Sequence, residues 1–273
     1  IPLNSGGTIN TNFTIGSGFN SHIYAITGQT DGKILVGGAF NTYNGNYNNH
    51  IVRLNSGGTV DSTFTNVDGF NGEVNTITIQ TDGKILVGGT FTSYDGNYRN
   101  YIARLDSGGT IDSTFNIGTG FNFYVYTIAV QTDGKILVGG LFNQYSGTSC
   151  NYIVRLDSGG TIDPTFDIFN GFENNNSTGN NSYVKTISLQ SDGKILIGGK
   201  FYSYSGQTAL NIIRLNSDGT RDNTFDIGSN RTLIDLSHNP NLSYVELNEC
   251  GVNTYFDDFS GLTSVYQLSL YNN

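Results

Sequence analysis

Aspartate and arginine side chains recur at regular intervals along the chain, and they are the first residues whose types could support chemistry. The aspartates are Asp61, Asp112, Asp163 and Asp222, and the arginines are Arg53, Arg104, Arg155 and Arg214. Carboxylates could act as general acids or bases, but an active site needs one asymmetric constellation within hydrogen-bond reach. Residues that occur once in every repeat unit are spread through the molecule instead. We therefore interpret both columns as structural capping or pairing between units, not as catalytic residues.

Other candidates for chemistry are sparse. The glycine-rich "GGTVDSTF" lacks the Lys-Ser/Thr pair of a phosphate loop. The insertion within 170–183 could chelate a cation through Glu173 and amide oxygens, but it lacks the alternating aspartates of calcium loops, and we interpret it as a plain loop. His22, His50 and His238 are isolated, and no CxxC or HExxH motif is present. The sequence predicts no metal and no cofactor.

Tyrosines separate into two groups, and one of them suggests recognition. Most phenylalanines fall in repeated columns and are expected in the core, whereas most tyrosines break the repeat. Several cluster in "GNYNNH" (45–50), "GNYRNY" (96–101) and "GTSCNY" (147–152), which together with "GQTALN" (206–211) are the most divergent segments. Recognition commonly resides on variable loops, and tyrosine combines a flat apolar face with a polar tip. The predicted contact residues are Tyr47, Tyr98, Arg99, Tyr101 and Tyr152; the alternative is neutral variation on an exposed rim.

The elements that would position these residues follow a repeat. "QTDGKILVGG" occupies 80–89 and 131–140, and close variants occur at 28–38 and 190–199, so the period is 51, 51 and 59 residues. Within one unit, "VYTIAVQ" (125–131) and "KILVGG" are typical of strands, and the Asp-Gly between them favours a type I′ hairpin turn. "YIVRL" (152–156) predicts a third strand.

A fourth strand is predicted at "TIDPTF" (161–166), on the sheet edge because Pro164 has no amide hydrogen to donate. The last glycine of each preceding turn (Gly58 in the first unit) is invariant among the copies, which indicates a positive φ angle. The diglycine after "ILV" would let neighbouring backbones approach closely. Four-stranded antiparallel meanders of this kind bury both faces by stacking radially, so the sequence predicts an all-β fold, a β-propeller.

The pattern "LxSGGTIDxTF…VxTIxxQxDGKILVGGxFxxYxG…NxIxRL" resembles the delta-60 repeat family of bacterial and phage proteins, which are assigned to β-propellers. The resemblance covers about residues 1–228 in four copies and implies a fold but little chemistry. Kelch repeats also place a diglycine after an apolar strand, but they carry a tryptophan that this chain lacks.

Both ends of the repeat region depart from it. Fourth strands are expected five times, at 8–13, 59–64, 110–115, 161–166 and 220–225. The surplus strand indicates a partial blade, and either another blade precedes residue 1 or this strand closes the ring. After the repeats, "LSYVELNECGV" (242–252) and "VYQLSLYNN" (265–273) resemble short leucine-rich repeats of Bacteroidetes and their phages. We expect a propeller at 1–228 and a leucine-rich-repeat-like segment at 229–273 that continues beyond the chain.

Composition limits the function classes. The net charge of −9 argues against a nucleic-acid partner, and the lack of an apolar run of eighteen residues argues against membrane insertion. We expect a non-enzymatic binding or structural module of an extracellular appendage or virion surface. A phage tail fibre or host-contact protein that recognises a cell-surface glycan or protein and joins other subunits fits best. The alternatives are a secreted or surface-anchored bacterial adhesin and a glycan-processing propeller enzyme. The enzyme would need acidic or histidine residues that break the symmetry on one face, and none stands out.

Overall fold

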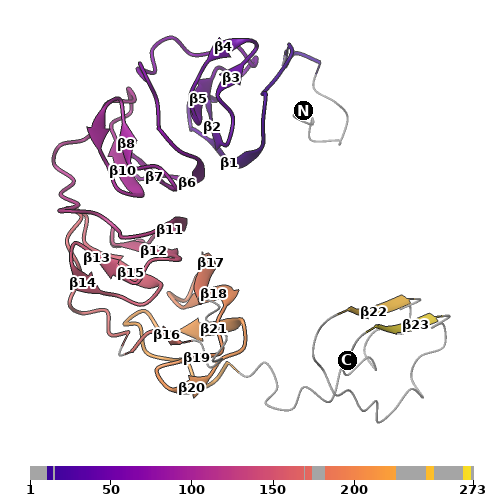
Figure 1. Ribbon diagram of the computed structural model, residues 1–273, viewed down its shortest axis with the longest axis vertical. Coiled ribbons are helices and arrows are strands. Elements are labelled where there is room, and N and C mark those ends of the chain that lie inside the picture. The colour runs from indigo at the N-terminus through magenta and orange to yellow at the C-terminus, as the bar shows by residue number, and fades with distance from the viewer. Residues whose placement is uncertain are drawn as a thin grey trace. The chain divides into compact units, whose positions relative to one another are not determined.

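The computed structural model describes residues 11–14, 16–168, 170–173 and 182–225, together with the backbone of strands at 244–248 and 267–271. The chain divides into two compact units, Ile1–Asp222 and Asn223–Asn273. Within the described ranges all regular elements are β-strands (Figure 1). No helix suited to crossing a bilayer occurs in those ranges.

The first unit contains four antiparallel three-stranded sheets, which we call blades 1 to 4. Blade 1 consists of β1 (Ile23–Gly28), β2 (Ile34–Gly38) and β5 (Ile51–Leu54). Blade 2 consists of β6 (Val74–Ile79), β7 (Ile85–Gly89) and β10 (Ile102–Leu105). Blade 3 consists of β11 (Val125–Val130), β12 (Ile136–Gly140) and β15 (Ile153–Leu156). Blade 4 consists of β17 (Tyr183–Leu189), β18 (Ile195–Lys200) and β21 (Ile212–Leu215). The central strand is the apolar "ILVGG" or "ILIGG" run in every blade, as predicted.

The predicted hairpin between the first two strands is present, but the predicted type I′ turn is wrong. Gln29 N donates to Lys33 O at 2.8 Å and Gly32 N donates to Gln29 O at 3.0 Å, which leaves a three-residue loop. Gly32 has a φ of +82°, whereas Asp31 is not in the positive-φ region. This geometry is a type I turn followed by a bulged glycine. The carboxylate of Asp31 accepts a hydrogen bond from Lys33 N at 3.1 Å, which stabilises the loop without a positive φ at the aspartate.

Type I′ turns occur instead in a short hairpin that the sequence analysis missed. In blade 1, β3 (Thr42–Tyr43) pairs with β4 (Asn46–Tyr47), and Asn44 and Gly45 between them have φ angles of +50° and +77°. Equivalent hairpins follow in the other blades: β8 (Ser93–Tyr94) with β9 (Asn97–Tyr98), β13 (Gln144–Tyr145) with β14 (Thr148–Ser149), and β19 (Ser203–Tyr204) with β20 (Gln207–Thr208). In blade 4 the strand β16 (Phe172–Glu173) joins β19. The segments predicted as recognition loops are therefore hairpins.

The predicted fourth strands are not regular strands. In blade 1 the segment 59–64 makes one isolated bridge, between Leu54 and Val60, with backbone bonds from Asp61 N to Arg53 O and from Asn55 N to Thr59 O at 2.8 Å each. The chain then turns, because the Asp61 carboxylate accepts hydrogen bonds from the backbone N and the hydroxyl of Thr63. The same bridge recurs in the other blades. Each described blade therefore has three regular strands and a bridged edge segment. Most of the expected strand at 8–13 lies outside the described residues.

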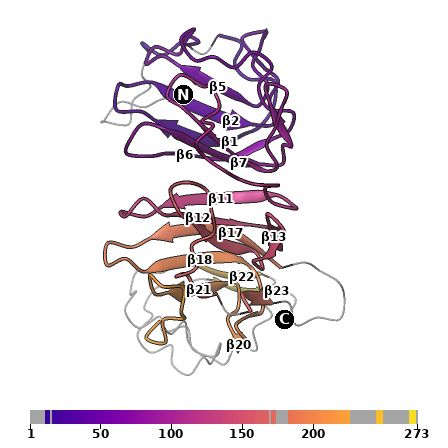
Figure 2. The same cartoon turned by 90° about the vertical axis from the view of Figure 1, so that its left-hand side faces the viewer.

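Neighbouring blades pack through their innermost strands. β1 lies beside β6, β6 beside β11, and β11 beside β17, so the blades follow one another in sequence order (Figure 2). The first glycine of the diglycine in blades 1 to 3 makes this approach possible, as predicted. A Cβ atom at Gly88, for example, would overlap Val125 of the next blade. Thr27 and Thr78 add hydrogen bonds from their hydroxyls to the carbonyls of Ile77 and Ile128 across two of the junctions, at 2.9 Å each.

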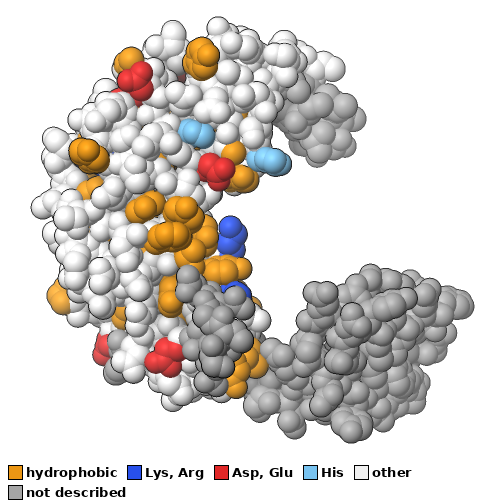
Figure 3. All heavy atoms as spheres, in the orientation of Figure 1, with side chains coloured by type: hydrophobic (Ala, Val, Ile, Leu, Met, Phe, Trp, Pro, Cys, Tyr) orange, Lys and Arg blue, Asp and Glu red, His pale blue; other side chains and the backbone are white. Residues whose placement is uncertain are grey.

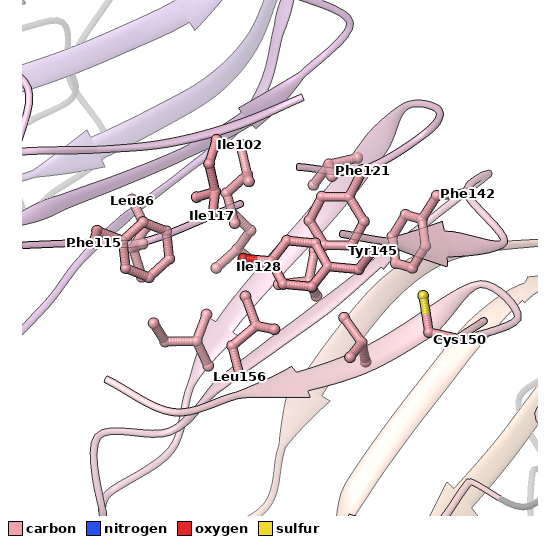
Figure 4. Packing of buried hydrophobic residues seen from close by; sticks show 14 residues of the cluster. Leu86, Ile102, Phe115, Ile117, Phe121, Ile128, Phe142, Tyr145, Cys150 and Leu156 are labelled. Atoms are coloured by element: carbon pink, nitrogen blue, oxygen red, sulfur yellow. The ribbon is translucent and has the colours of Figure 1, made fainter. Parts of the chain in front are cut away.

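The repeated aromatic residues form the core, as predicted. In blade 3 the ring of Phe121 lies 4.2 Å from Phe142 and 4.6 Å from Tyr145 (Figure 4). The buried Tyr145 hydroxyl donates a hydrogen bond to Gly160 O at 2.6 Å. Gly160 has a φ of +94°, and the positive φ predicted for this column is confirmed in all four copies. The tyrosine thus ties the short hairpin to the turn after the third strand.

The second unit is described only by β22 (Tyr244–Asn248) and β23 (Gln267–Tyr271). These strands pair in parallel, and Tyr244 is opposite Gln267. The offset of 23 residues equals the spacing of the leucine-rich pattern. The remainder of the segment predicted at 229–273 lies outside the described residues.

Candidate functional site

The repeated charged residues form a buried network in each blade. In blade 2 the Arg104 Nε atom lies 2.7 Å from Asp112 Oδ2, and Lys84 Nζ lies 3.1 Å from the same oxygen. The Arg104 guanidinium lies 4.5 Å above the Phe115 ring and donates to Ser158 O in the next blade. Equivalent contacts occur at Arg53 and Arg155. This arrangement supports the structural interpretation of both columns, since Arg53, Arg104 and Arg155 each connect their own edge segment to the following blade.

These aspartates are unsuited to proton transfer at neutral pH. Burial alone would raise the pKa of Asp112, but hydrogen bonds from Thr114, Lys84 and Arg104 outweigh it and hold the pKa well below its ordinary value. Asp61 and Asp163 have the same balance and the same direction of pKa shift. The carboxylates therefore stay ionised and serve as acceptors of fixed hydrogen bonds.

The five residues predicted to contact a ligand occupy two kinds of position. Tyr47 and Tyr98 lie at the ends of short hairpins, and each is 84% exposed. Arg99 follows Tyr98 and donates to its carbonyl oxygen at 2.7 Å. Among the described residues, no hydrogen bond or ring contact joins Tyr47 to the other four. The structure therefore distributes the five residues over three blades.

Tyr101 and Tyr152 lie where the chain enters the third strand, and both are partly buried. Their φ angles are +67° and +74°. The backbone of Tyr152 is part of the sheet, since its N donates to Phe142 O at 2.9 Å and its O accepts from Gly140 N at 3.1 Å. A positive φ at a large side chain is uncommon. The backbone geometry at the start of the third strand therefore constrains these two positions, in addition to any contact with a ligand.

A different set of residues breaks the symmetry at one position of the innermost strands. The pairing between the first two strands shifts register between Ile23 and Ala25 in blade 1, and at the equivalent place in every blade. The residues skipped by the pairing are Tyr24, Asn75, Tyr126 and Lys185. A β-bulge of this kind bends the strand and redirects a side chain, and bulges are common next to functional sites.

Sequence reasoning missed these residues, although a signal was present. The strands read "IYAI", "VNTI", "VYTI" and "VKTI" around the bulge. The flanking positions keep a β-branched residue or alanine, whereas the second position changes its chemistry in almost every copy. A variable column inside a repeated strand could have indicated a position that serves something other than architecture.

The bulged side chains of all four blades open onto one depression, which we call the bulge pocket. Its volume is about 690 Å³, and its lining residues are Ile23, Tyr24, Glu73, Asn75, Thr90, Tyr124, Tyr126 and Lys185. Figure 3, in the orientation of Figure 1, shows hydrophobic side chains gathered beside acidic, basic and histidine side chains along the inner edge of the propeller unit, where the first strands of the blades lie. The glycan-processing alternative required symmetry-breaking residues of this type, and Glu73 is one.

Contacts in the bulge pocket order its aromatic walls. Lys185 Nζ lies 4.3 Å from the centroid of the Tyr126 ring, and Tyr126 meets Tyr183 edge-on at 5.7 Å. The Tyr124 ring packs against Phe123 at 4.2 Å and against Tyr101 at 5.8 Å. Tyr101, predicted as a contact residue, therefore supports the wall of this pocket.

The polar groups of the bulge pocket suit binding better than proton transfer. Asn75 Nδ2 donates to Val125 O at 2.8 Å, which holds the amide in place across the blade junction. Burial, followed by the neighbouring Tyr183 and Tyr124, raises the pKa of Tyr126, so its hydroxyl stays protonated at neutral pH. Glu73 is the one carboxylate among the lining residues. Among the described residues, no group of three or more His, Cys, Asp or Glu side chains is placed to hold a metal ion.

Comparison with solved structures finds propellers of several kinds. The extracellular domain of BT4673 from B. thetaiotaomicron matches with a TM-score of 0.49 and 18% identity, over 81% of this chain and 24% of that one. Streptogramin B lyase matches with a TM-score of 0.43 and 20% identity, over 74% of this chain and 54% of that one. The WD40 propeller domain of Doa1 matches with a TM-score of 0.43 and 17% identity, over 71% of this chain and 50% of that one. Similarity this low carries no argument about function.

The chain thus spans about half, or less, of the lengths of these solved chains. No curated protein matches it significantly. A sequence profile, by contrast, matches four times, at residues 29–64, 80–115, 131–166 and 190–225, which together make up more than half of the chain. Each match begins just before the Asp-Gly hairpin and ends at the phenylalanine after the bridged edge segment. The chain therefore belongs to the family described as "Domain of unknown function (DUF5122) beta-propeller".

Proposed function

We propose that the propeller unit is a non-enzymatic recognition module that binds a cell-surface carbohydrate in the bulge pocket. The observation that carries this proposal is the convergence of four bulged side chains of three types, one from each blade, on a single depression. Architecture needs the same residue in every blade, whereas a ligand without fourfold symmetry can be contacted by different residues from different blades.

The chemistry of the lining favours a sugar. Tyr24, Tyr124 and Tyr126 offer flat apolar faces that also carry a hydroxyl group, and such rings stack on the apolar face of a pyranose. Glu73, Asn75 and Lys185 provide an acceptor, an amide and a cation for hydroxyl or acidic substituents. A volume of about 690 Å³ lies within the usual range for small-molecule sites, roughly 300–1,000 Å³.

A glycan-processing enzyme is the second candidate, because Glu73 breaks the symmetry of the repeat inside a pocket. Two features weigh against it. Glycoside hydrolases use a pair of carboxyl groups, and the lining supplies one. A tyrosine acting as the base of a lyase would need a pKa closer to the working pH, whereas the pKa of Tyr126 is raised.

The biological setting that fits this module is an extracellular appendage. A low charged fraction of 13%, many glycines and tyrosines, and tandem blades followed by a second repeat pattern in 229–273 support a tail fibre or another host-contact protein of a virion. A surface-anchored bacterial adhesin would use the same pocket in the same way. In both settings the leucine-rich-repeat-like segment would connect the propeller to further subunits.

Glycan-array binding with purified chain tests the proposal. Wild-type protein should bind a restricted set of glycans saturably, and the double variant Tyr124→Ala/Tyr126→Ala should lose about tenfold or more in affinity, which corresponds to about 1.4 kcal/mol or more. The matched control is Tyr47→Ala/Tyr98→Ala, which also removes two tyrosines but at exposed hairpins.

The outcomes separate the candidates. Loss of binding in the control alone would move the site to the hairpins, where the sequence analysis expected it. A flat array for folded wild-type protein would refute carbohydrate recognition. Release of new reducing ends or unsaturated sugars from a bound polysaccharide, abolished by Glu73→Gln, would establish the enzyme instead.

A further inference from the structure

Blade 1 exposes an apolar face, whereas the corresponding faces of the other three blades are buried. In blades 2 to 4 the first strand presents a valine and an isoleucine to the preceding blade; in blade 2 these are Val74 and Ile77, which are 0% and 6% exposed. Their counterparts in blade 1 are Ile23 and Ile26, which are 39% and 66% exposed. A large exposed apolar pair in a repeat position that is otherwise buried indicates a contact surface.

The exposed face is hollowed as well as apolar. A depression of about 710 Å³ lies over it, and the lining residues that form its apolar walls are Phe13, Phe19, Ile23, Ile26, Ile34 and Val36. In the other blades, the corresponding surface is covered by the central and third strands of the preceding blade. The depression therefore lies where the central and third strands of a preceding blade would pack.

Blade 4 exposes the opposite half of the same junction. At Gly37, Gly88 and Gly139 an added Cβ would overlap a valine of the following blade, whereas at Gly198 it would meet only Thr186 of its own blade at 3.0 Å and Asn211 O at 3.9 Å. Ile212 is 36% exposed, although the isoleucines at its position in the other blades are fully buried. Among the described residues, none fills the recess of blade 4 at the place where the other blades receive a valine.

We infer that the chain associates head to tail with a second copy of itself, so that Ile23 and Ile26 of one copy cover Gly198 and Ile212 of the other. The argument is continuity with an interface that the chain already forms three times, between blades 1 and 2, 2 and 3, and 3 and 4. The two uncovered faces are the complementary halves of a fourth such interface. A blade of the same repeat is the partner whose shape and polarity are known to fit.

Hydrogen bonding across the new junction follows the same pattern. At two of the three junctions Thr27 and Thr78 donate from their hydroxyls to an isoleucine carbonyl of the next blade, whereas blade 3 has Ala129 in this column. Ser188 occupies their column in blade 4 and is exposed. In the proposed pair it donates to the Ile26 carbonyl of the second copy. The junction therefore combines apolar packing with a polar contact that fixes its register.

The interface joins two different faces, so it is heterologous and leads to a closed ring or to a filament. Two copies joined at both junctions bring together twice four blades, which is at the upper end of the common range of about four to eight. Ile23 lines both the bulge pocket and the exposed face of blade 1. The association is therefore tested at Ile26 and Gly198, which do not line the bulge pocket.

Light scattering after size exclusion, measured over a range of protein concentrations, tests the association. The wild-type chain should have about twice the monomer mass of 29.5 kDa, or a larger multiple if filaments form. Ile26→Asp places a charge on the exposed face, and Gly198→Leu fills the recess; each variant alone should be monomeric. Far-UV circular dichroism spectra of both variants should match the wild-type spectrum, because neither position is packed against another blade in the monomer.

Mixing the two variants gives the decisive readout. Ile26→Asp retains an intact blade 4 face and Gly198→Leu retains an intact blade 1 face, so the mixture should form a heterodimer that does not grow further. Tyr98→Asp, at an exposed hairpin, should leave the wild-type mass unchanged. A wild-type chain that stays at monomer mass up to about 100 μM, and so has a dissociation constant weaker than that concentration, would overturn the inference. So would a multimer that both face variants leave intact, or variants that fail to complement each other on mixing.

Discussion

The Arg–Asp–Lys network and the bulge pocket lie in the same four blades and follow opposite rules. In the network each blade repeats the same contacts, with 2.7 Å between the arginine Nε and the aspartate Oδ2 in every copy. In the bulge pocket the equivalent positions carry Tyr24, Asn75, Tyr126 and Lys185. One region is buried and uniform, whereas the other is open and varied.

The difference separates architecture from recognition within one repeat. The three junctions between neighbouring blades are alike, so each uses the same arginine to connect an edge segment to a turn of the next blade. A ligand occupies the pocket once, so no two blades need to contribute the same group. Residues that repeat should therefore control stability, and residues that break the repeat should control binding. The following experiments test that division, beginning with the largest expected effect.

Acidification should weaken the network in several blades at once. The folded-state pKa values of Asp61, Asp112 and Asp163 lie below the unfolded value, which is about 3.9. Their contribution to stability is therefore complete above about pH 4 and is lost as the pH falls from there through the folded pKa. Melting temperatures measured at pH 7, 5, 3 and 2 should be level between the first two and fall steeply after that. A large fall between pH 7 and pH 5 would contradict this assignment.

Removing one member of the network should be costly. Asp112→Ala leaves the buried Arg104 without its carboxylate, which should lower the free energy of unfolding by about 3–5 kcal/mol. Asp82→Ala, whose side chain is 54% exposed and accepts one hydrogen bond from Lys84 N, is the matched control and should change it by about 1 kcal/mol or less. Urea unfolding followed by circular dichroism measures both. Equal effects for the two variants would remove the distinction between buried and exposed carboxylates.

The diglycine offers a test of blade packing with an internal control. Gly88→Ala forces a methyl group into Val125 of the next blade, and overpacking of this kind should destabilise by about 1–3 kcal/mol. Gly198→Ala makes the same change where no valine follows, and it should be nearly neutral in the monomer. Urea unfolding of the two variants at low protein concentration gives the comparison. A similar loss of unfolding free energy in both variants would indicate that the destabilisation arises within the strand and not from the contact between blades.

A substitution in the bulge pocket should have a small effect on stability and a large effect on binding. Tyr126→Ala removes a partly buried ring that contacts Lys185 and Tyr183, so the loss of stability should stay near about 1 kcal/mol. On the proposed function, affinity for a glycan should fall about tenfold or more. Thermal melting and binding measured on the same preparation compare the two effects. A variant that loses much more stability than expected but keeps the wild-type glycan affinity would indicate that Tyr126 serves the architecture.

The smallest effect is expected at a repeated turn. Ser146 has a φ of +46° where blade 1 has Asn44 at +50°, and asparagine is preferred over serine at this position of a type I′ turn. Ser146→Asn should therefore stabilise by about 0.5 kcal/mol. The melting temperature of the variant should rise by a few degrees at most. A decrease would indicate that the Ser146 hydroxyl contact with Thr119 N at 3.4 Å matters more than the turn preference.

Some predictions failed for reasons that lie in local hydrogen bonding. The Asp-Gly dipeptide signals a hairpin, but the loop length depends on which backbone pair closes it, and here Gln29 and Lys33 close it. The segment 59–64 has a strand-like composition, yet the Asp61 carboxylate binds Thr63 and ends the pairing after one bridge. A side chain that competes for the backbone decides such cases, and residue types alone rank the options poorly.

The sequence by itself determined the repeat, the order of strands in each blade, the aromatic core and the glycines that need a positive φ or a close neighbour. All of these follow from interactions within one unit or between identical units, so the same residues recur wherever the interaction does. Only the tertiary structure decided the bulge pocket. Its residues come from four blades about fifty positions apart, and a register shift together with the glycine–valine contact between blades brings them together. The variable column in the first strands marks the positions of these residues, but it does not show that they lie close together, because their proximity depends on packing between blades.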